Sequence, residues 1–139
     1  MPAIVGLIML VPRDGLPCND IEILNGWVRE PPPVVKVAAG YFTLRNTGKT
    51  AATIVRIEGS CCSEVVMHEN IITGDQVHMS HISKLVVPAH GTSSFMPGGA
   101  HLMLINPRRP LRHGLTVDLE FFCADGGTLS TVFNVVADR

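Results

Sequence analysis

Four side chains carry soft metal-binding groups at defined spacings: His68, Met79, His101 and Met103. Ten residues separate His68 from Met79, and twenty-one separate Met79 from His101. The surrounding segment, residues 67–103, holds five of the chain's six histidines and four of its six methionines. Neutral imidazole and thioether suit Cu(I), whereas hard cations prefer carboxylate and carbonyl oxygens. The residue types therefore indicate a copper site.

Other metal centres fit these residues less well. Structural and catalytic zinc sites use cysteine, histidine and carboxylate ligands rather than thioethers. A blue-copper centre needs a cysteine thiolate close to two histidines, with a weak axial methionine. No cysteine lies between residues 67 and 103, so direct electron transfer is the weaker of the two copper interpretations.

The composition is that of a globular domain without a nucleic-acid partner. The chain has 139 residues, a length that suggests one domain. Hydrophobic residues make up 46% and charged residues 17%, and the formal net charge is -1. Because lysine and arginine are scattered, neither nucleic acid nor an anionic membrane surface is expected to bind.

Residues 1–20 are expected to form an N-terminal segment outside the folded domain. The apolar run at residues 4–11 has the length of a signal-peptide core but lacks a positive flank and a small-residue cleavage site. It is either a degenerate or truncated export signal or a buried strand, and it is too short to span a bilayer. Cys18 is not expected to carry a lipid, because Pro17 stands where a small residue would be needed.

Residues 21–139 are expected to form a single β-sandwich domain. Strand-like runs alternate with turn signals, and residues 115–121 alternate apolar and polar side chains as a half-buried strand does. Short strands separated by Gly, Pro and Asn predict an antiparallel sandwich or barrel. In such a fold, two strand ends and a polar loop that carries Met79 could gather the four ligands at one end.

The chain resembles the periplasmic copper chaperones of the PCuAC type. The spacing of His68, Met79, His101 and Met103 is that family's copper-binding signature, without a gap or shift. The segments "VVMHEN", "GDQVHMSHI" and "FMPGGAHLML" resemble the family's segments around these ligands. Further similar segments are "GWVREPPP", "AAGYFTLRNTGKTAATIV" and "PLRHGLTVDLEF".

The resemblance implies a cupredoxin-like Greek-key β-sandwich that binds one Cu(I) ion through the four signature residues. It implies a copper chaperone that delivers the ion by ligand exchange in the periplasm or another extracytoplasmic compartment. The expected acceptor is the CuA subunit of cytochrome c oxidase or another periplasmic copper protein. Met67 occupies an optional methionine position of the signature and is an additional candidate ligand. Because neighbouring residues on a strand point to opposite faces, we expect His68 rather than Met67 to face the metal.

Several residues lie outside the family's pattern. His78, His81 and His90 flank Met79 and are candidates for a second, weaker site that prefers Cu(II), although solvated loop histidines explain them equally well. Met96, before "PGG", is expected to serve packing rather than copper binding.

The four cysteines show no Cys-x-x-Cys spacing, which argues against a zinc ribbon or a thioredoxin-like pair. Cys61 and Cys123 are expected to be small buried hydrophobes. Cys61 and Cys62 are not expected to bond each other, because the ring that adjacent cysteines form strains the peptide. A reduced thiolate near His68 would compete with the thioethers for Cu(I).

Two other classes of protein are alternatives to a chaperone. An enzyme is not expected, because the chain lacks the serine-hydrolase pattern G-x-S-x-G and the zinc-protease pattern H-E-x-x-H. A noncatalytic β-sandwich binding module, in which His and Met are incidental, is the alternative that copper titration would separate from a chaperone.

Overall fold

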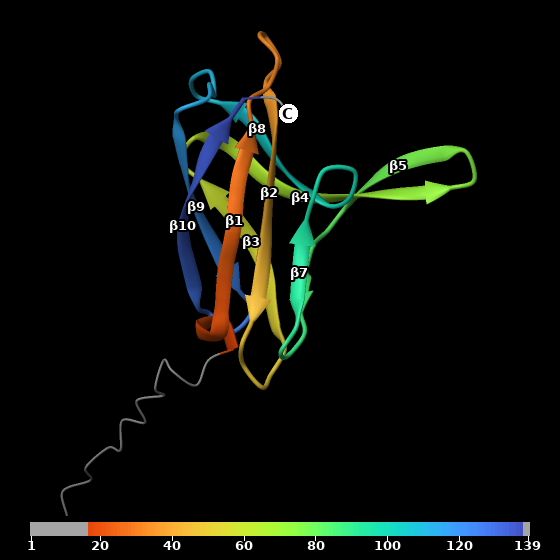
Figure 1. Ribbon diagram of the computed structural model, residues 1–139, viewed down its shortest axis with the longest axis vertical. Coiled ribbons are helices and arrows are strands. Elements are labelled where there is room, and N and C mark those ends of the chain that lie inside the picture. The colour runs from red at the N-terminus through yellow and green to blue at the C-terminus, as the bar shows by residue number, and fades with distance from the viewer. Residues whose placement is uncertain (1–16, 138–139) are drawn as a thin grey trace, which may run out of the picture.

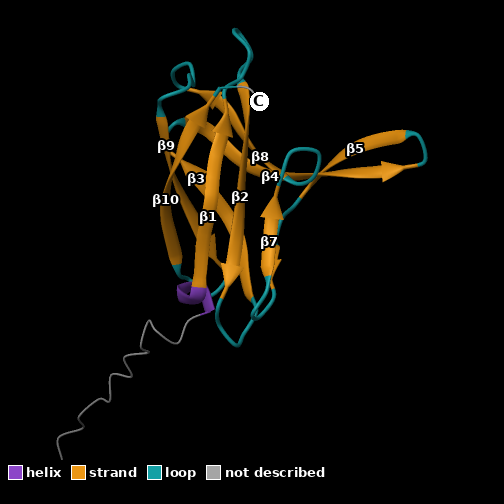
Figure 2. Cartoon of the chain, viewed as in Figure 1, coloured by secondary structure: helices purple, strands orange, loops and turns teal. Residues whose placement is uncertain are grey.

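The computed structural model describes residues 17–137 and is built almost entirely from β-strands (Figures 1 and 2). The apolar run at residues 4–11 lies outside the described residues. No helix in the described part of the chain is long and apolar enough to cross a bilayer. The elements are η2 (Pro17–Asp20), β1 (Ile21–Arg29), β2 (Val37–Asn46), β3 (Ala52–Gly59), β4 (Cys62–Thr73), β5 (Gln76–His81), β6 (Leu85–Val87), β7 (Thr92–Phe95), β8 (His101–Pro107), β9 (Thr116–Cys123) and β10 (Thr128–Val136).

The strands follow one hydrogen-bonded path in the order β5-β4-β8-β2-β1-β10-β9-β3-β6. β8 and β7 share one edge of β2, since β8 pairs with residues 37–40 and β7 with residues 42–45. The path curls over, so that β3 and β4 pack against each other without pairing. The expected all-β sandwich is confirmed. Among the described pairs one is parallel, β1 with β10, because these first and last strands are joined by the whole domain rather than by a hairpin.

Alternation of apolar and polar residues places the core between the layers. On β9, Val117, Leu119 and Phe121 are buried while Asp118 between them is exposed, as the sequence pattern predicts. Phe121 meets Phe42 of β2 edge-on, with ring centroids 5.2 Å apart. Such aromatic contacts contribute about 0.5–1.5 kcal/mol beyond the area that they bury. The core thereby holds β2 and β9 of the two layers together.

The cysteines form two disulfides, Cys18–Cys123 and Cys61–Cys62, and no cysteine among the described residues is free. The expectation that Cys61 and Cys123 are simple buried hydrophobes is wrong, as is the expectation that Cys61 and Cys62 do not bond. Cys123 is buried, but the fold brings η2 to the end of β9, with 6.2 Å between the Cα atoms of Cys18 and Cys123. The second disulfide lies at the turn between β3 and β4.

The segment around Met79 is a strand rather than the expected loop. β4 continues past His68 to Thr73, and β5 returns beside it in an antiparallel hairpin that projects from the sandwich (Figure 1). The two-residue turn is Gly74-Asp75, and Gly74 has φ of 61°. Glycine adopts this left-handed conformation without steric cost, which is why Gly-Asp between two short runs is a hairpin signal.

Candidate metal centre

Two of the predicted ligands face each other across neighbouring strands. His68 on β4 pairs in register with His101 on β8, and the centroids of their rings are 6.1 Å apart. Both side chains are half-buried on the outer face of the sheet, because Met67 and Leu102 beside them point into the core. The sheet register therefore creates a pair of imidazoles next to solvent.

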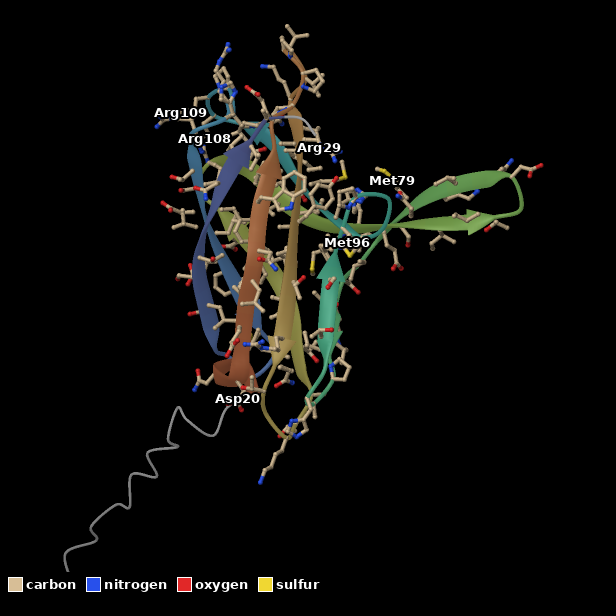
Figure 3. The ribbon with its side chains drawn as sticks, in the orientation of Figure 1. Asp20, Arg29, Met79, Met96, Arg108 and Arg109 are labelled. Carbon is tan, nitrogen blue, oxygen red and sulfur yellow. A yellow bond between two sulfur atoms is a disulfide. The ribbon has the colours of Figure 1, made fainter. Side chains whose placement is uncertain are left out.

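The two methionines of the signature lie on this same outer face. Met103 is two residues beyond His101, so it shares that face, and it lies between Val66 of β4 and Ala39 of β2. Met79 on β5 pairs with Asn70, which is two residues beyond His68. The side chain of Met79 is 54% exposed and lies near the base of the projecting hairpin (Figure 3). We call this surface, formed by His68, Met79, His101 and Met103, the ligand face.

A tight turn orients His101. The segment Met96–Gly99 is closed by the Gly99 amide, which donates to the Met96 carbonyl at 2.9 Å. Gly98 within this turn has φ of 86°, and its carbonyl accepts a bond of 3.4 Å from the Asn70 side chain of β4. The Gly99 carbonyl accepts from Nδ1 of His101 at 3.2 Å.

This hydrogen bond places the proton on Nδ1 of His101 and leaves the lone pair on Nε2. Histidines that bind metals commonly donate their other ring nitrogen to a carbonyl or carboxylate in this way, which holds the ring and its tautomer. The turn before β8 thus leaves Nε2 of His101 available as a candidate ligand atom.

The surroundings of His68 favour its neutral form. Burial lowers the pKa of its imidazole below the ordinary value, and the nearby His81 and His101 lower it further. Its Nδ1 is buried and has no hydrogen-bond partner among the described residues. Because a metal ligand must be deprotonated, a neutral imidazole with an unpartnered buried nitrogen is suited to bind an ion.

The structure places Met67, His78 and His90 away from the ligand face. Met67 is 4% exposed and belongs to the hydrophobic core, although it precedes His68. His78 points to the opposite face of β5 from Met79 and bonds to Gln76 at 3.1 Å. His90 lies in the loop between β6 and β7, so the trio His78, His81 and His90 is not brought together. Met96 is 59% exposed, which does not support the expected role in packing.

The cysteines are also remote from the ligand face. Cys62 pairs with Pro107 at the far end of the β4–β8 ladder from His68. Six residues of extended strand span roughly 20 Å. Because of this distance and the disulfides, no cysteine thiolate among the described residues competes for a metal at His68.

Sequence reasoning did not single out His81 as a neighbour of His68. The two residues pair in register across the hairpin, and their ring centroids are 5.8 Å apart. The signal that could have found this contact is the Gly-Asp turn, since a two-residue hairpin loop determines which residues of the two strands face each other.

Comparison with known proteins identifies relatives along most of the chain. The family described as "Putative lipoprotein LpqE-like" matches residues 21–135. A protein of Leifsonia xyli subsp. xyli, described as "Putative lipoprotein Lxx21020", is 27% identical over 115 residues, which cover 82% of this chain and 68% of the relative.

Solved structures share the fold. The Cu(I)-bound form of DR1885 from Deinococcus radiodurans has a TM-score of 0.64 at 26% identity, over 83% of this chain and 76% of that one. The copper-bound PCuAC domain of PmoF2 has a TM-score of 0.71 at 18% identity, over 85% of this chain and 93% of that one. The resemblance to PCuAC domains is confirmed.

Proposed function

Because the chain belongs to the LpqE-like family, which shares its fold with copper-bound PCuAC domains, we propose that it is a chaperone for one Cu(I) ion. The proposed ligands are His68, Met79, His101 and Met103. The observation that carries this proposal is the ligand face, on which two imidazoles stand 6.1 Å apart between two thioethers. Soft, neutral ligands of this kind match Cu(I) and are individually replaceable.

The proposed activity is transfer of the ion rather than turnover of a substrate. Met79 is more exposed than His68, so an acceptor's thiolate or imidazole reaches it first. We infer that Met79 leaves before the half-buried histidines. The basis for this order is the exposed hairpin, and not the loop that the sequence suggested.

The proposed location is the periplasm or another extracytoplasmic compartment. Disulfides persist in oxidising compartments and are rare in the cytosol, and this chain forms two. The matching family and the relative from Leifsonia xyli are both described as "Putative lipoprotein", which also supports an extracytoplasmic location. In that compartment, the CuA subunit of cytochrome c oxidase is the proposed acceptor, with other periplasmic copper proteins as alternatives.

The test is an anaerobic titration of the full chain with Cu(I) against a chromogenic chelator, followed by X-ray absorption on the loaded protein. We expect one tight equivalent with mixed sulfur and nitrogen ligands and with thioether rather than thiolate sulfur. Changing His101→Ala and Met103→Leu together should abolish it. His113→Ala is the control, because His113 bonds to Glu30 at 3.0 Å and not to the ligand face. Absence of tight binding in the unmodified chain would leave a noncatalytic binding module instead.

A further inference from the structure

His81 extends the pair of imidazoles into a row of three. It lies on β5 directly opposite His68, which in turn lies directly opposite His101 on β8. His68 is therefore flanked on both sides, with ring centroids 5.8 Å away at His81 and 6.1 Å away at His101. All three rings are on the outer face, because alternate residues of each strand face the core or the neighbouring surface.

Each of these two distances lies near the upper limit for imidazoles that share one ion. A metal lies about 2 Å from a coordinating ring nitrogen, so two rings on one ion have centroids at most roughly 6 Å apart. Both pairs are close to this limit before any side chain moves. Because His81 and His101 flank His68 on opposite sides, a shared ion requires their rings to turn toward each other over His68, and the ring of His81 is exposed to solvent.

We propose that His68, His81 and His101 form a second set of ligands that binds Cu(II). Imidazole nitrogen suits Cu(II), whereas the thioethers of Met79 and Met103 are soft ligands that suit Cu(I). For the same nitrogen ligands, divalent copper binds more tightly than zinc. Water completes the coordination on the open side of the face.

This inference rests on the proposed Cu(I) function, because both sets contain His68 and His101. The ion therefore occupies one set or the other, and the protein takes up copper in either oxidation state through one location. His81 belongs only to the Cu(II) set. The site differs from the histidine trio suggested by the sequence, since only His81 of that trio reaches the ligand face.

The experiment is an aerobic titration of the full chain with Cu(II) against a competing chelator, with pulsed electron paramagnetic resonance to count coordinated imidazoles. Three imidazoles are expected in the unmodified chain. His81→Ala should weaken Cu(II) binding by roughly tenfold or more and reduce the count, while leaving anaerobic Cu(I) affinity unchanged. His81→Gln, which keeps a polar side chain at this exposed position, should behave in the same way.

His78→Ala is the matched control, because His78 is on the same strand but on the opposite face and should change neither affinity. Unchanged Cu(II) binding and imidazole count in His81→Ala would overturn the second set while leaving the Cu(I) function intact. Equal weakening of Cu(I) and Cu(II) would also overturn it, since His81 would then belong to a single common site. Tighter binding of Zn(II) than of Cu(II) would refute the assigned ion.

Discussion

His68 and His101 are 33 positions apart in the sequence but are directly opposed on β4 and β8, with ring centroids 6.1 Å apart. Backbone hydrogen bonds of the sheet determine this relationship, so it does not depend on a flexible loop. The histidines form the fixed part of the ligand face, and Met79 on the projecting hairpin is its most accessible part.

Met79→Leu should weaken Cu(I) binding and change the rate at which copper passes to a thiol acceptor. Leucine keeps the apolar volume but removes the thioether, so the change tests the ligand and not the shape. Stopped-flow transfer and chelator competition measure both effects. Val77→Ala is the control, since Val77 is on the same face of β5 and is 63% exposed. If Met79→Leu changes neither rate nor affinity, Met79 is not the first ligand to leave.

The imidazole of His68 should titrate below pH 6.5 in the metal-free protein, because burial and two neighbouring histidines lower its pKa. Between about pH 6.5, the ordinary value for an unfolded chain, and the lowered folded value, the unfolded state binds more protons. The free energy of unfolding therefore decreases as the pH falls through that window, because protonation of His68 favours the unfolded state. Nuclear magnetic resonance titration of the ring protons measures the pKa directly.

Removal of His81 should raise the pKa of His68 toward its ordinary value without restoring it, because burial is the larger cause of the lowered pKa. A His81→Ala variant in which the pKa of His68 did not move would contradict the assigned contact between the two rings. Glu30 provides an internal comparison, because the hydrogen bond from His113 lowers the pKa of its carboxyl group, and removal of His81 should leave that pKa unchanged.

Breaking the disulfide Cys18–Cys123 should lower the free energy of unfolding by about 2–5 kcal/mol, because it closes a long loop in the unfolded chain. The bridged residues are 105 positions apart. Denaturant unfolding of a Cys18→Ser, Cys123→Ser variant measures the loss. Copper affinity should not change, because Cys123 is on β9 and the proposed ligands are on β4, β5 and β8. An equally stable variant would show that the crosslink does not constrain the unfolded state.

Gly26→Ala should destabilise the fold by about 1–3 kcal/mol, as overpacked cores generally do. A Cβ atom at Gly26 would lie 2.0 Å from the ring of Phe133, which is 1% exposed and has no room to withdraw. Thermal unfolding followed by circular dichroism measures the effect. Gly40→Ala is the comparison, since a Cβ atom there would come no closer than 3.4 Å to its neighbours. Equal midpoints of thermal unfolding for Gly26→Ala and Gly40→Ala would contradict the predicted clash with Phe133.

Gly98→Ala should weaken copper binding by loosening the turn that orients His101. Gly98 has φ of 86°, and alanine is strained in that conformation by about 1 kcal/mol. Gly126→Ala is a matched control, because Gly126 has φ of 89° and open space around it, as Gly98 has, but lies between β9 and β10. Both variants should lose similar stability, and only Gly98→Ala should lose copper affinity. Equal losses of affinity would mean that the turn has no special role.

The sequence predicted those parts of the fold that depend on local pattern. Apolar and polar side chains alternate along residues 117–121, and turn residues separate such runs. This pattern is sufficient to predict strands, because every second side chain of a strand faces the buried side of the sheet. The segment 76–81 was missed because its side chains are nearly all exposed, so no apolar alternation marks it as a strand. Its only local signal is the Gly74-Asp75 turn.

The residue types of His68, Met79, His101 and Met103 are sufficient to predict a site for a soft metal, because soft and hard donor chemistry belongs to the side chains themselves. Which residues meet depends on strand register and on the order of the strands in the sheet. Register pairs His81 with His68, places Met67 in the core, and sends His78 to the opposite face. The path of the chain joins Cys18 to Cys123. These contacts were decided only by the tertiary structure, because they depend on hydrogen bonds between segments that the sequence keeps apart.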